Sequence, residues 1–484
     1  MFNLNEVNAA SGVGGGILPM QMGDLEALRK SLDAGTATDV ATFTGGQALS
    51  IQSLDHTLQA TLADNKEFKL FNTLAKMPAG NTVDEWTEAT SQGGFPGSSA
   101  NTQTGTIASA QGTYARRTAL VKFLMTQCQV SFAQSLVDTI VQSEAQENQM
   151  GTLRLLRDVE HLSFYGDSDV VPTEFDGIAK QLISLGSSDH IISAGGGPLS
   201  GTGSTGLQTI ASAAATIGGL GNFGTPTHLF ASPLSASDLD VNLDPAYRVP
   251  LNNGAAANLG TPVRGIVTAQ GDIGIERNVF LLDQNSQKPF EVDYSAIAAS
   301  NATAPVSVTA VAASDSASKF TTGWDGNYYY AVAGVTNLGQ SVVTKSIQYA
   351  VAVGDKVTLT ITASAGGTET GYAIYRSRRN GTNDTADFRL VARVAKGGAT
   401  TTFVDYNDDI PGTSKAFLLN LNPGHTAMTW RQLLPLTRFN LYPTNAAVIP
   451  WALLLFGYLR MTKRRHHVMI KNILPTTATW LPKG

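Results

Sequence analysis

Apolar residues recur at helical spacing most clearly after Ser131. Ser131 and Gln134 have the spacing of a capping box, which marks the start of a helix. The centre of the following stretch, residues 142–149, is nearly all polar. The pattern predicts one long helix from Ser131 to Phe164 that lies across a surface rather than through a core. The apolar pairs, three or four residues apart, are Leu136/Ile140, Val137/Val141, Leu153/Leu156 and Val159/Leu162.

Residues 81–131, just before this helix, have strand-like ends and a polar middle. The ends are Thr82–Trp86 and Thr118–Val130, and Gly, Ser, Thr and Gln fill the stretch between them. A polar segment of this length is seldom a passive connector in a compact protein. We predict an extended two-stranded flap that buries little by itself and is stabilised by a neighbour.

The chain before the flap offers few positions that could form a core. Residues 1–50 are rich in glycine, with one short amphipathic helix predicted at Asp24–Leu32. Residues 51–76 carry Leu and Phe at helical steps, and Pro78 and Gly80 end that segment. We expect the first fifty residues to be an arm that is ordered only by lying on another surface.

Strand and helix patterns alternate between the long helix and residue 300. The stretches "HIISA" (190–194) and "THLFAS" (227–232) have the composition of buried strands. Residues Leu207–Ile217 are rich in alanine and predict a helix. A second helix is predicted for "PLSASDLDVNL" (233–243), where proline stands at the favoured first position.

Residues 303–415 read as a run of short strands separated by turns such as Asn380-Gly381. Six or seven alternating strands in a stretch of this length are typical of a β-sandwich. The chain then resumes with "FLLNLNP" (417–423), so we expect the sandwich to be inserted into the preceding domain. The predicted strands are "PVSVTAVAA", "NYYYAVAGVT", "DKVTLTITAS", "TGYAIYRSRR", "DFRLVARVAK" and "TTTFVDY".

The closing stretch, residues 446–474, consists of an apolar run followed by a cluster of cationic residues. The run Ala446–Leu459 is shorter than the roughly 17–25 residues of a spanning helix, and Pro450 interrupts it, so we expect no membrane span. Lys463, Arg464 and Arg465 are open to two interpretations. They can neutralise nucleic-acid phosphates, or they can form a turn between two strands whose cations meet carboxylates on a neighbouring subunit. We favour strand–turn–strand, with DNA contact as a secondary role.

Composition, net charge and cysteine content narrow the classes of protein that fit this pattern. Only 15% of the 484 residues are charged, against about a quarter in a typical soluble protein, so much of the surface is suited to contact with other protein. The net charge of −5 argues against general attraction to phosphate backbones. The single Cys128 excludes an intrachain disulfide framework or a cysteine-rich zinc site, and it suits folding in a reducing cytoplasm. The first twenty residues lack the pattern of a secretory signal.

The best enzymatic motif is "GTGSTG" (201–206), a literal G-x-G-x-x-G ahead of a predicted helix. No acidic residue follows about 20 residues on to hold a ribose, so we interpret the motif as a flexible loop. No G-x-S-x-G elbow is present. We expect Cys128, in an apolar strand, to be buried and inert. The sequence predicts no catalytic and no cofactor-binding residue.

The histidines and acidic clusters predict no metal site either. The seven histidines are scattered, and adjacent His466 and His467 are expected on opposite faces of a strand, where they cannot hold one metal. We interpret Asp84/Glu85/Glu88 and Asp405/Asp408/Asp409 as solvated turns. Weak Ca²⁺ binding by Asp405–Asp409 stays open, although the spacing is not that of a calcium loop.

The order of these segments resembles the major capsid protein of tailed bacteriophages, with the Hong Kong 97-type fold shared with herpesviruses. The likeness covers about three quarters of the chain and rests on order and spacing. The strands "GYAIYRS" and "YYYAVAGVTNLGQS" are similar to fibronectin type III strands in reversed order. The residues that carry the capsid resemblance are "LFNTLAKMPAGNTVDEW" (70–86), "HLSFYGDS" (161–168), "TPTHLFASPLSASDL" (225–239) and "FGYLRMTKRRHHVMIKNIL" (456–474).

The resemblance implies an α+β capsid fold with an inserted, immunoglobulin-like β-sandwich. It implies this division: 1–50 N-terminal arm, 51–80 arm or peripheral helix, 81–130 extended loop over a neighbouring subunit, 131–176 spine helix of the peripheral domain, 177–300 mainly axial domain, 301–415 inserted sandwich, and 416–484 a return to the axial and peripheral domains with the closing strands.

The function that the resemblance implies is structural. Copies would assemble in the host bacterial cytoplasm into hexamers and pentamers, and these would close an icosahedral phage head around double-stranded DNA held by weak inner-surface contact. Portal, scaffolding and decoration proteins are the expected partners. Two alternatives stay open at this point. One is an adhesive or carbohydrate-binding protein that uses Trp324 and Tyr328–Tyr330 as a stacking platform, and the other is a nucleotide-dependent enzyme built on "GTGSTG".

Overall fold

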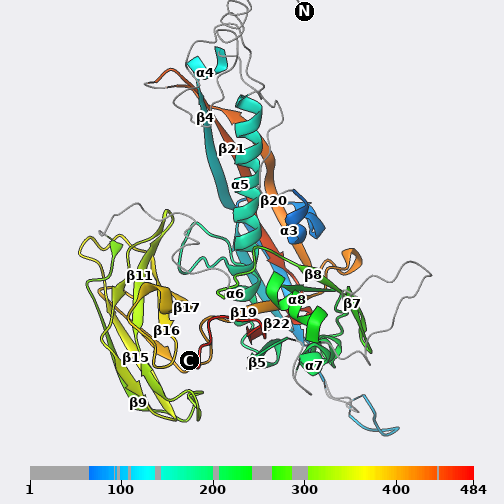
Figure 1. Ribbon diagram of the computed structural model, residues 1–484. Coiled ribbons are helices and arrows are strands. Elements are labelled where there is room, and N and C mark those ends of the chain that lie inside the picture. Colours follow the sequence, from blue (N-terminus) through cyan, green and yellow to red (C-terminus); the bar gives the residue numbers. More distant parts are fainter. Residues whose placement is uncertain are drawn as a thin grey trace, which may run out of the picture. The chain divides into compact units, whose positions relative to one another are not determined.

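The computed structural model describes nine stretches of the chain (Figure 1). They are residues 65–91, 93–94, 99–106, 111–136, 143–199, 206–242, 264–285, 303–443 and 446–484. The predicted arm, its short helix and the leucine repeat before residue 65 lie outside these stretches, as does most of "GTGSTG". Apolar residues at helical steps predict a helix in residues 51–76. In the described part of this segment the structure has a short 3-10 turn, Asn65–Glu67, followed by helix α3, Lys69–Thr73.

A four-stranded sheet is built from strands at both ends of the sequence. Its order is β1 (Ala75–Pro78), β20 (Met428–Asn440), β21 (Val448–Met461) and β4 (Lys122–Ser131). The β1–β20 pair is parallel and the other two pairs are antiparallel. The apolar run of the closing stretch is therefore β21, an inner strand of this long sheet. Strands with neighbours on both sides are commonly rich in apolar residues, which explains the run without a membrane.

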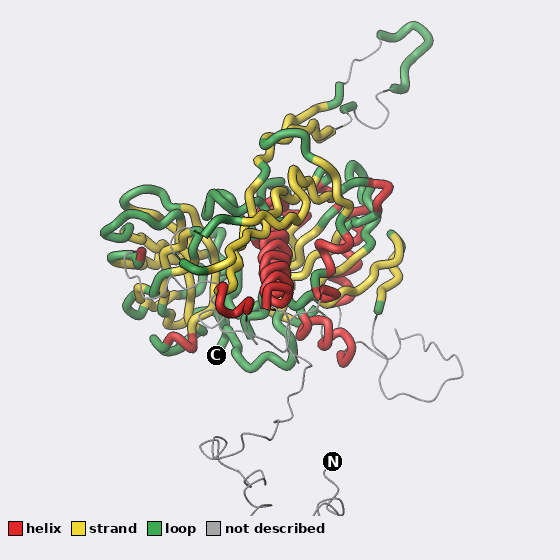
Figure 2. Tube along the Cα trace, turned by 90° about the horizontal axis from the view of Figure 1, so that it is seen from above, coloured by secondary structure: helices red, strands yellow, loops and turns green. Residues whose placement is uncertain are grey.

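The helix predicted after Ser131 covers one face of the long sheet. Ser131 Oγ accepts a bond from the Gln134 amide at 3.1 Å, as the capping pattern predicted. Helix α4 spans Phe132–Leu136 and α5 spans Ser143–Tyr165, while residues 137–142 are not among those described. Figure 2, which colours helices red and strands yellow, shows the long helix lying against strands. The helix packs tightly on the sheet at Gly151, where an added Cβ would lie 2.4 Å from the Cys128 Sγ atom.

Helix α5 also fixes the segment that leads to the flap. Glu160, fully buried, accepts bonds from the backbone amides of Leu70 and Phe71, each at 2.9 Å, and from Asn278 Nδ2 at 2.6 Å. A carboxylate at the first amides of α3 satisfies donors that a helix start leaves unpaired. The entry to the flap is thereby tied to the C-terminal part of the long helix.

A second sheet has six strands in the order β5-β22-β19-β6-β8-β7. Both predicted strands and both predicted helices of residues 190–243 are found in it or beside it. Helices α7 (Gly206–Gly218) and α8 (Pro233–Asn242) contribute Ile210, Ile217 and Leu239 to its buried core, and α6 spans Ile178–Ile183. The strand bounds are β5 Ile191–Gly197, β6 His228–Ala231, β7 Gly265–Thr268, β8 Gly271–Arg277, β19 Ser414–Leu419 and β22 Val468–Ile473.

Residues 303–413 form a β-sandwich. One sheet has the order β18-β15-β9, and the other has β12-β11-β16-β17 with β13 beside β11. Side chains such as Leu359, Tyr330 and Ile374 fill the core between them. All six predicted strands are present, whereas the immunoglobulin-like topology stays a prediction. The bounds are β9 Ser307–Ser314, β10 Gly326–Tyr328, β11 Tyr330–Thr336, β12 Gly339–Gln340, β13 Thr344–Lys345, β14 Tyr349–Val351, β15 Asp355–Thr362, β16 Gly371–Ser377, β17 Phe388–Ala395 and β18 Thr400–Asp405.

The close approach at Gly151 yields a stability prediction. Gly151→Val should lower the free energy of unfolding by about 1–3 kcal/mol, because overpacking a filled core forces neighbouring atoms to move. Chemical denaturation measures this loss. Cys128→Ala removes the sulfur and should reduce it in a double-mutant cycle. Thr152→Val, one residue on and half-buried, serves as the control, and an equal loss there would contradict the packing explanation.

Candidate functional site

The flap predicted for residues 81–131 contains a two-stranded ribbon with two different faces. Strands β2 (Val83–Ser91) and β3 (Thr113–Leu120) pair antiparallel, and neither pairs with another described strand. Side chains at even positions of β2 are half-buried and those at odd positions are exposed. One face of the ribbon therefore contacts the protein near its base, and the other is free.

Asp84 anchors the inner face of the ribbon to the long sheet. Its carboxylate accepts bonds from Arg431 Nε at 2.9 Å, Tyr458 Oη at 2.5 Å and Arg460 Nη1 at 3.3 Å. Burial raises the pKa of Asp84, but the hydrogen bonds from Tyr458 and Arg431 outweigh it and hold this pKa below its usual value. The carboxylate is therefore charged at neutral pH and binds two guanidinium groups at once.

Glu88 repeats this arrangement four residues further along β2. It accepts bonds from Arg464 Nη2 at 2.9 Å and Arg117 Nε at 3.2 Å, and its side chain is only 10% exposed. Between the two acids, the Trp86 ring lies 5.7 Å from the Arg460 guanidinium. We call Asp84, Trp86, Glu88 and the arginines that they contact the flap root.

The flap root corrects two interpretations of the sequence. The three acids lie in strand β2 and not in a turn, and of the three only Glu85, which pairs with exposed Arg116, is solvated. Strand–turn–strand is confirmed for the cationic stretch, as β21, a 3-10 turn at Arg464–His466, and β22. However, Arg460 and Arg464 meet carboxylates of their own chain rather than of a neighbouring subunit. One signal was readable in the sequence, because acids at positions 84 and 88 of a strand share a face.

The face of the long sheet opposite α5 is open. Phe123 and Met125 on β4 and Phe439 on β20 are 50%, 62% and 55% exposed. Their strand partners Phe456, Leu454 and Ala452 are consecutive even positions of β21, so all of these side chains share one face. The flap root lies on this same face, since Tyr458 follows Phe456 at the next even position. We call the exposed part, built on Phe123, Met125 and Phe439, the open face.

Four of the seven histidines gather around Asn420, at the end of β19. The Asn420 amide donates to His467 Nδ1 at 3.2 Å, and its side-chain nitrogen lies 3.1 Å from His425 Nδ1 and 3.2 Å from His466 Nδ1. His190 Nδ1 lies 3.0 Å from the carbonyl oxygen of His467. His466 ends the 3-10 turn and His467 follows it, so the prediction that they occupy opposite faces of one strand was wrong.

Burial favours the neutral form of His190, His466 and His467. The pKa of fully buried His467 falls to about 3, chiefly through burial and then through neighbouring His466. Burial also lowers the pKa of His190 and of His466. His190, His466 and His467 therefore pack as uncharged rings at neutral pH beside Lys463 and Arg465.

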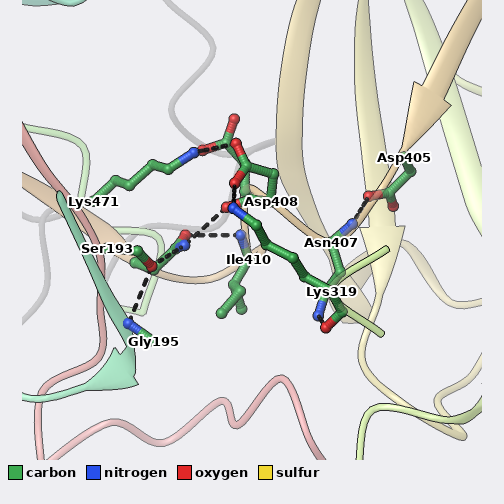
Figure 3. Close-up of polar contacts among 10 residues, drawn as sticks. Ser193, Gly195, Lys319, Asp405, Asn407, Asp408, Ile410 and Lys471 are labelled. Atoms are coloured by element: carbon green, nitrogen blue, oxygen red, sulfur yellow. Dashed lines mark hydrogen bonds and ion pairs between the residues drawn. The ribbon is translucent and has the colours of Figure 1, made fainter. Parts of the chain in front are cut away.

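The second acidic cluster joins the sandwich to the six-stranded sheet (Figure 3). Asp405 is buried and bonds Arg376 Nη1 at 2.5 Å, so it is not a solvated turn residue. Asp408 accepts bonds from Lys319 of the sandwich and Lys471 of β22. Burial raises the pKa of Asp408, but these two lysines lower it below its usual value. Both carboxylates therefore have cationic partners of the chain itself.

The remaining candidates lie apart from any site. Trp324, Tyr328 and Tyr330 are core side chains of the sandwich, at most 6% exposed, so the predicted stacking platform is wrong. Cys128 is buried, as predicted, and burial raises the pKa of its thiol. Among the residues that the structure describes, no group of three or more His, Cys, Asp or Glu side chains could hold a metal ion. No helix in these stretches is long and apolar enough to cross a membrane.

Known proteins similar to this chain are phage capsid proteins. The major capsid protein of Staphylococcus phage K is 24% identical over 469 residues, which cover 93% of this chain and 95% of the relative. The major capsid protein of Staphylococcus phage S25-3 matches with the same identity and coverage. No established protein-family profile matches. The chain is thus related over nearly its whole length to phage major capsid proteins, and the predicted resemblance is confirmed.

Solved structures with a similar arrangement include capsids. The capsid of an empty GTA particle matches 90% of this chain and all of its own, with 9% identity and a TM-score of 0.48. The capsid of Myoviridae phage XM1 matches 88% of this chain and 99% of its own, with 11% identity and a TM-score of 0.41. The flap, long helix, α/β sheet and closing strands stand in the predicted order within the described stretches.

The flap root predicts that two neighbouring glutamates respond differently to the same change. Glu88→Gln should weaken the charged bonds to Arg464 and Arg117, each worth about 1.5–3 kcal/mol, and speed hydrogen–deuterium exchange of β2 amides. Glu85→Gln, on the exposed face of the same strand, is the matched control. It should leave exchange nearly unchanged, because exposed ion pairs contribute little. Equal effects of the two variants would contradict the anchoring role.

The histidine cluster predicts a loss of stability in mild acid. A histidine held neutral in the folded chain titrates near pH 6.5 when unfolded, so stability is complete above pH 6.5. Below pH 6.5 the free energy of unfolding decreases as the pH is lowered towards the folded pKa of about 3. For His467 the decrease is up to about 1.4 kcal/mol per pH unit. His467→Asn keeps an acceptor for the Asn420 amide, and it should flatten this slope in denaturation curves between pH 7 and 4. An unchanged slope would count against the assignment.

Proposed function

We propose that this chain is the repeating shell subunit of a phage head, with a structural rather than an enzymatic role. Copies associate into hexamers and pentamers that close an icosahedral shell around double-stranded DNA. The relatives named above support the capsid role. The observation that carries the mechanism is the open face, an apolar surface of the long sheet that the described part of the chain leaves exposed.

The occupant that we propose for the open face is the flap of a neighbouring copy. A two-stranded ribbon with a polar tip buries too little to be stable alone, and the flap root fixes only its base. The outer face of the ribbon carries exposed Val83, Tyr114 and Leu120, so it has apolar groups to place against another protein. An extended ribbon that begins on the open face of its own subunit has the form needed to continue onto the next.

Repetition supplies the strength of such a shell. Each flap contact is small, but every copy gives one flap and receives another, and a closed shell multiplies the contact. A head-to-tail contact of this kind forms rings when the rotation closes. The low proportion of charged residues, 15%, suits a subunit with much of its surface in contact with sister copies.

The proposed DNA contact is weak. The chain carries a net charge of −5, and two cations of the closing stretch, Arg460 and Arg464, are paired with Asp84 and Glu88. A lining that bound phosphates tightly would hinder filling and emptying of the head. We propose that the subunit is a virion component assembled in the host bacterial cytoplasm, with portal, scaffolding and decoration proteins as partners.

Shortening the flap tests this function. Replacing "GGFPGSS" (93–99) by a two-residue turn should give folded, soluble subunits that fail to close shells, because the ribbon no longer reaches its neighbour. Electron microscopy scores particles and circular dichroism scores folding. A permuted order of the same seven residues keeps the length and should still assemble. Normal particles from the shortened flap would rule out the role assigned to it.

A further inference from the structure

The outer edge of β4 is an unused hydrogen-bonding surface. On its inner side β4 pairs with β21 from Lys122–Gly457 to Ser131–Val448 in unbroken register. No described strand pairs with its other side. The backbone N–H and C=O groups on such an edge are a template for one more strand.

The opposite edge of the same sheet is protected in a way that β4 is not. Beyond Gln432, where β1 stops, β20 carries Pro435 and two shifts of register against β21. Proline and irregular register are common devices that stop an edge from pairing. Strand β4 has neither over its ten residues. Of the two edges of the long sheet, the edge of β4 is therefore the one that can pair with an additional strand.

A cavity of about 530 Å³ lies beside this edge. Its apolar lining includes Phe123 and Met125 of β4, Leu162 of α5, and Val335, Tyr375 and Leu390 of the sandwich. A strand added to β4 would place a side chain near this cavity, and the volume admits an aromatic ring. Recognition of an extended segment by an open edge, with a pocket for one side chain, is an established binding mode.

One stretch of the arm has the composition that such an edge would select. Residues 36–44, "TATDVATFT", stand between Gly35 and the pair Gly45-Gly46. Every even position in it is a β-branched residue, Thr or Val, and these favour strands. The stretch has one charge, Asp39, and one aromatic side chain, Phe43.

We propose that residues 36–44 of a second copy add to the outer edge of β4 as a fifth strand of the long sheet, with Phe43 in the adjacent cavity. The proposal rests on the shell function and deepens it, because it assigns to the arm both a partner, the neighbouring copy, and a binding site, the edge of β4. Phe123 and Met125 belong both to the open face and to the cavity, so the flap of a neighbour would cover the open face while Phe43 of an arm contacts these two side chains from the edge of β4.

Cysteine cross-linking between two different proteins tests this. Both carry Cys128→Ala, which removes the only native thiol. One also carries Gln129→Cys, at an exposed position of β4, and the other carries a single cysteine placed in turn at each of residues 36–44. Directly opposed residues of paired strands lie within disulfide range. Oxidised co-assemblies should give a linked dimer, of twice the subunit mass, at one or two adjacent positions of the scan.

Controls make the outcomes decisive. Ser11→Cys in the arm should give no dimer, and Val40→Pro should abolish the dimer by removing a backbone donor from the segment. Particles that form without a cross-link at any position, or that cross-link equally from residue 11, overturn the strand addition and leave the shell function standing. A link that forms only when both cysteines are placed in the same chain, and not between the two variants, overturns the second copy as donor. Absence of particles from the unsubstituted chain would overturn the shell function, and this inference with it.

Discussion

A sheet has two faces, and in the part of the chain that the structure describes the second face of the longest sheet is covered only at the flap root. Helix α5 packs on one side at Gly151 and Cys128, while Phe123, Met125 and Phe439 remain exposed on the other. Burying an apolar side chain of this size contributes about 1.5–3 kcal/mol, so the free subunit retains a substantial driving force for association. The shell that we propose is the state in which every copy of this face is covered.

The flap root links folding of the subunit to its competence for assembly. Asp84 meets arginines more than 340 positions away in sequence, on strands β20 and β21. These guanidinium groups converge only when the closing strands have paired, so the direction of the flap base depends on that pairing. A partly folded chain would present neither the open face nor an oriented flap, which limits association of incomplete subunits.

Local patterns were readable in the sequence, and long-range pairings were not. The capped helix start at Ser131, the strands of the sandwich and the inner strand β21 follow from periodicity within one segment. The pairing of Glu88 with Arg464 does not follow from such patterns, because neither segment contains a signal that identifies the other as its partner. The hypothesis that Tyr328 belongs to a stacking platform was wrong for a related reason. An aromatic residue in a strand has the same local signature whether it faces the core or a ligand. The histidine cluster arises from three separate segments that meet at Asn420.

Oxidation of Met125 tests the central claim most directly. Dilute subunits and assembled particles are treated with the same dose of peroxide, and sulfoxide formation at each methionine is followed by mass spectrometry. Met428 and Met461, buried within the subunit, are internal references that should react slowly in both states. The account predicts fast oxidation of Met125 in free subunits and at least about tenfold protection in particles, by the exposure dependence of this chemistry. Equal rates in the two states would show that sister copies leave the open face uncovered, and would contradict the account.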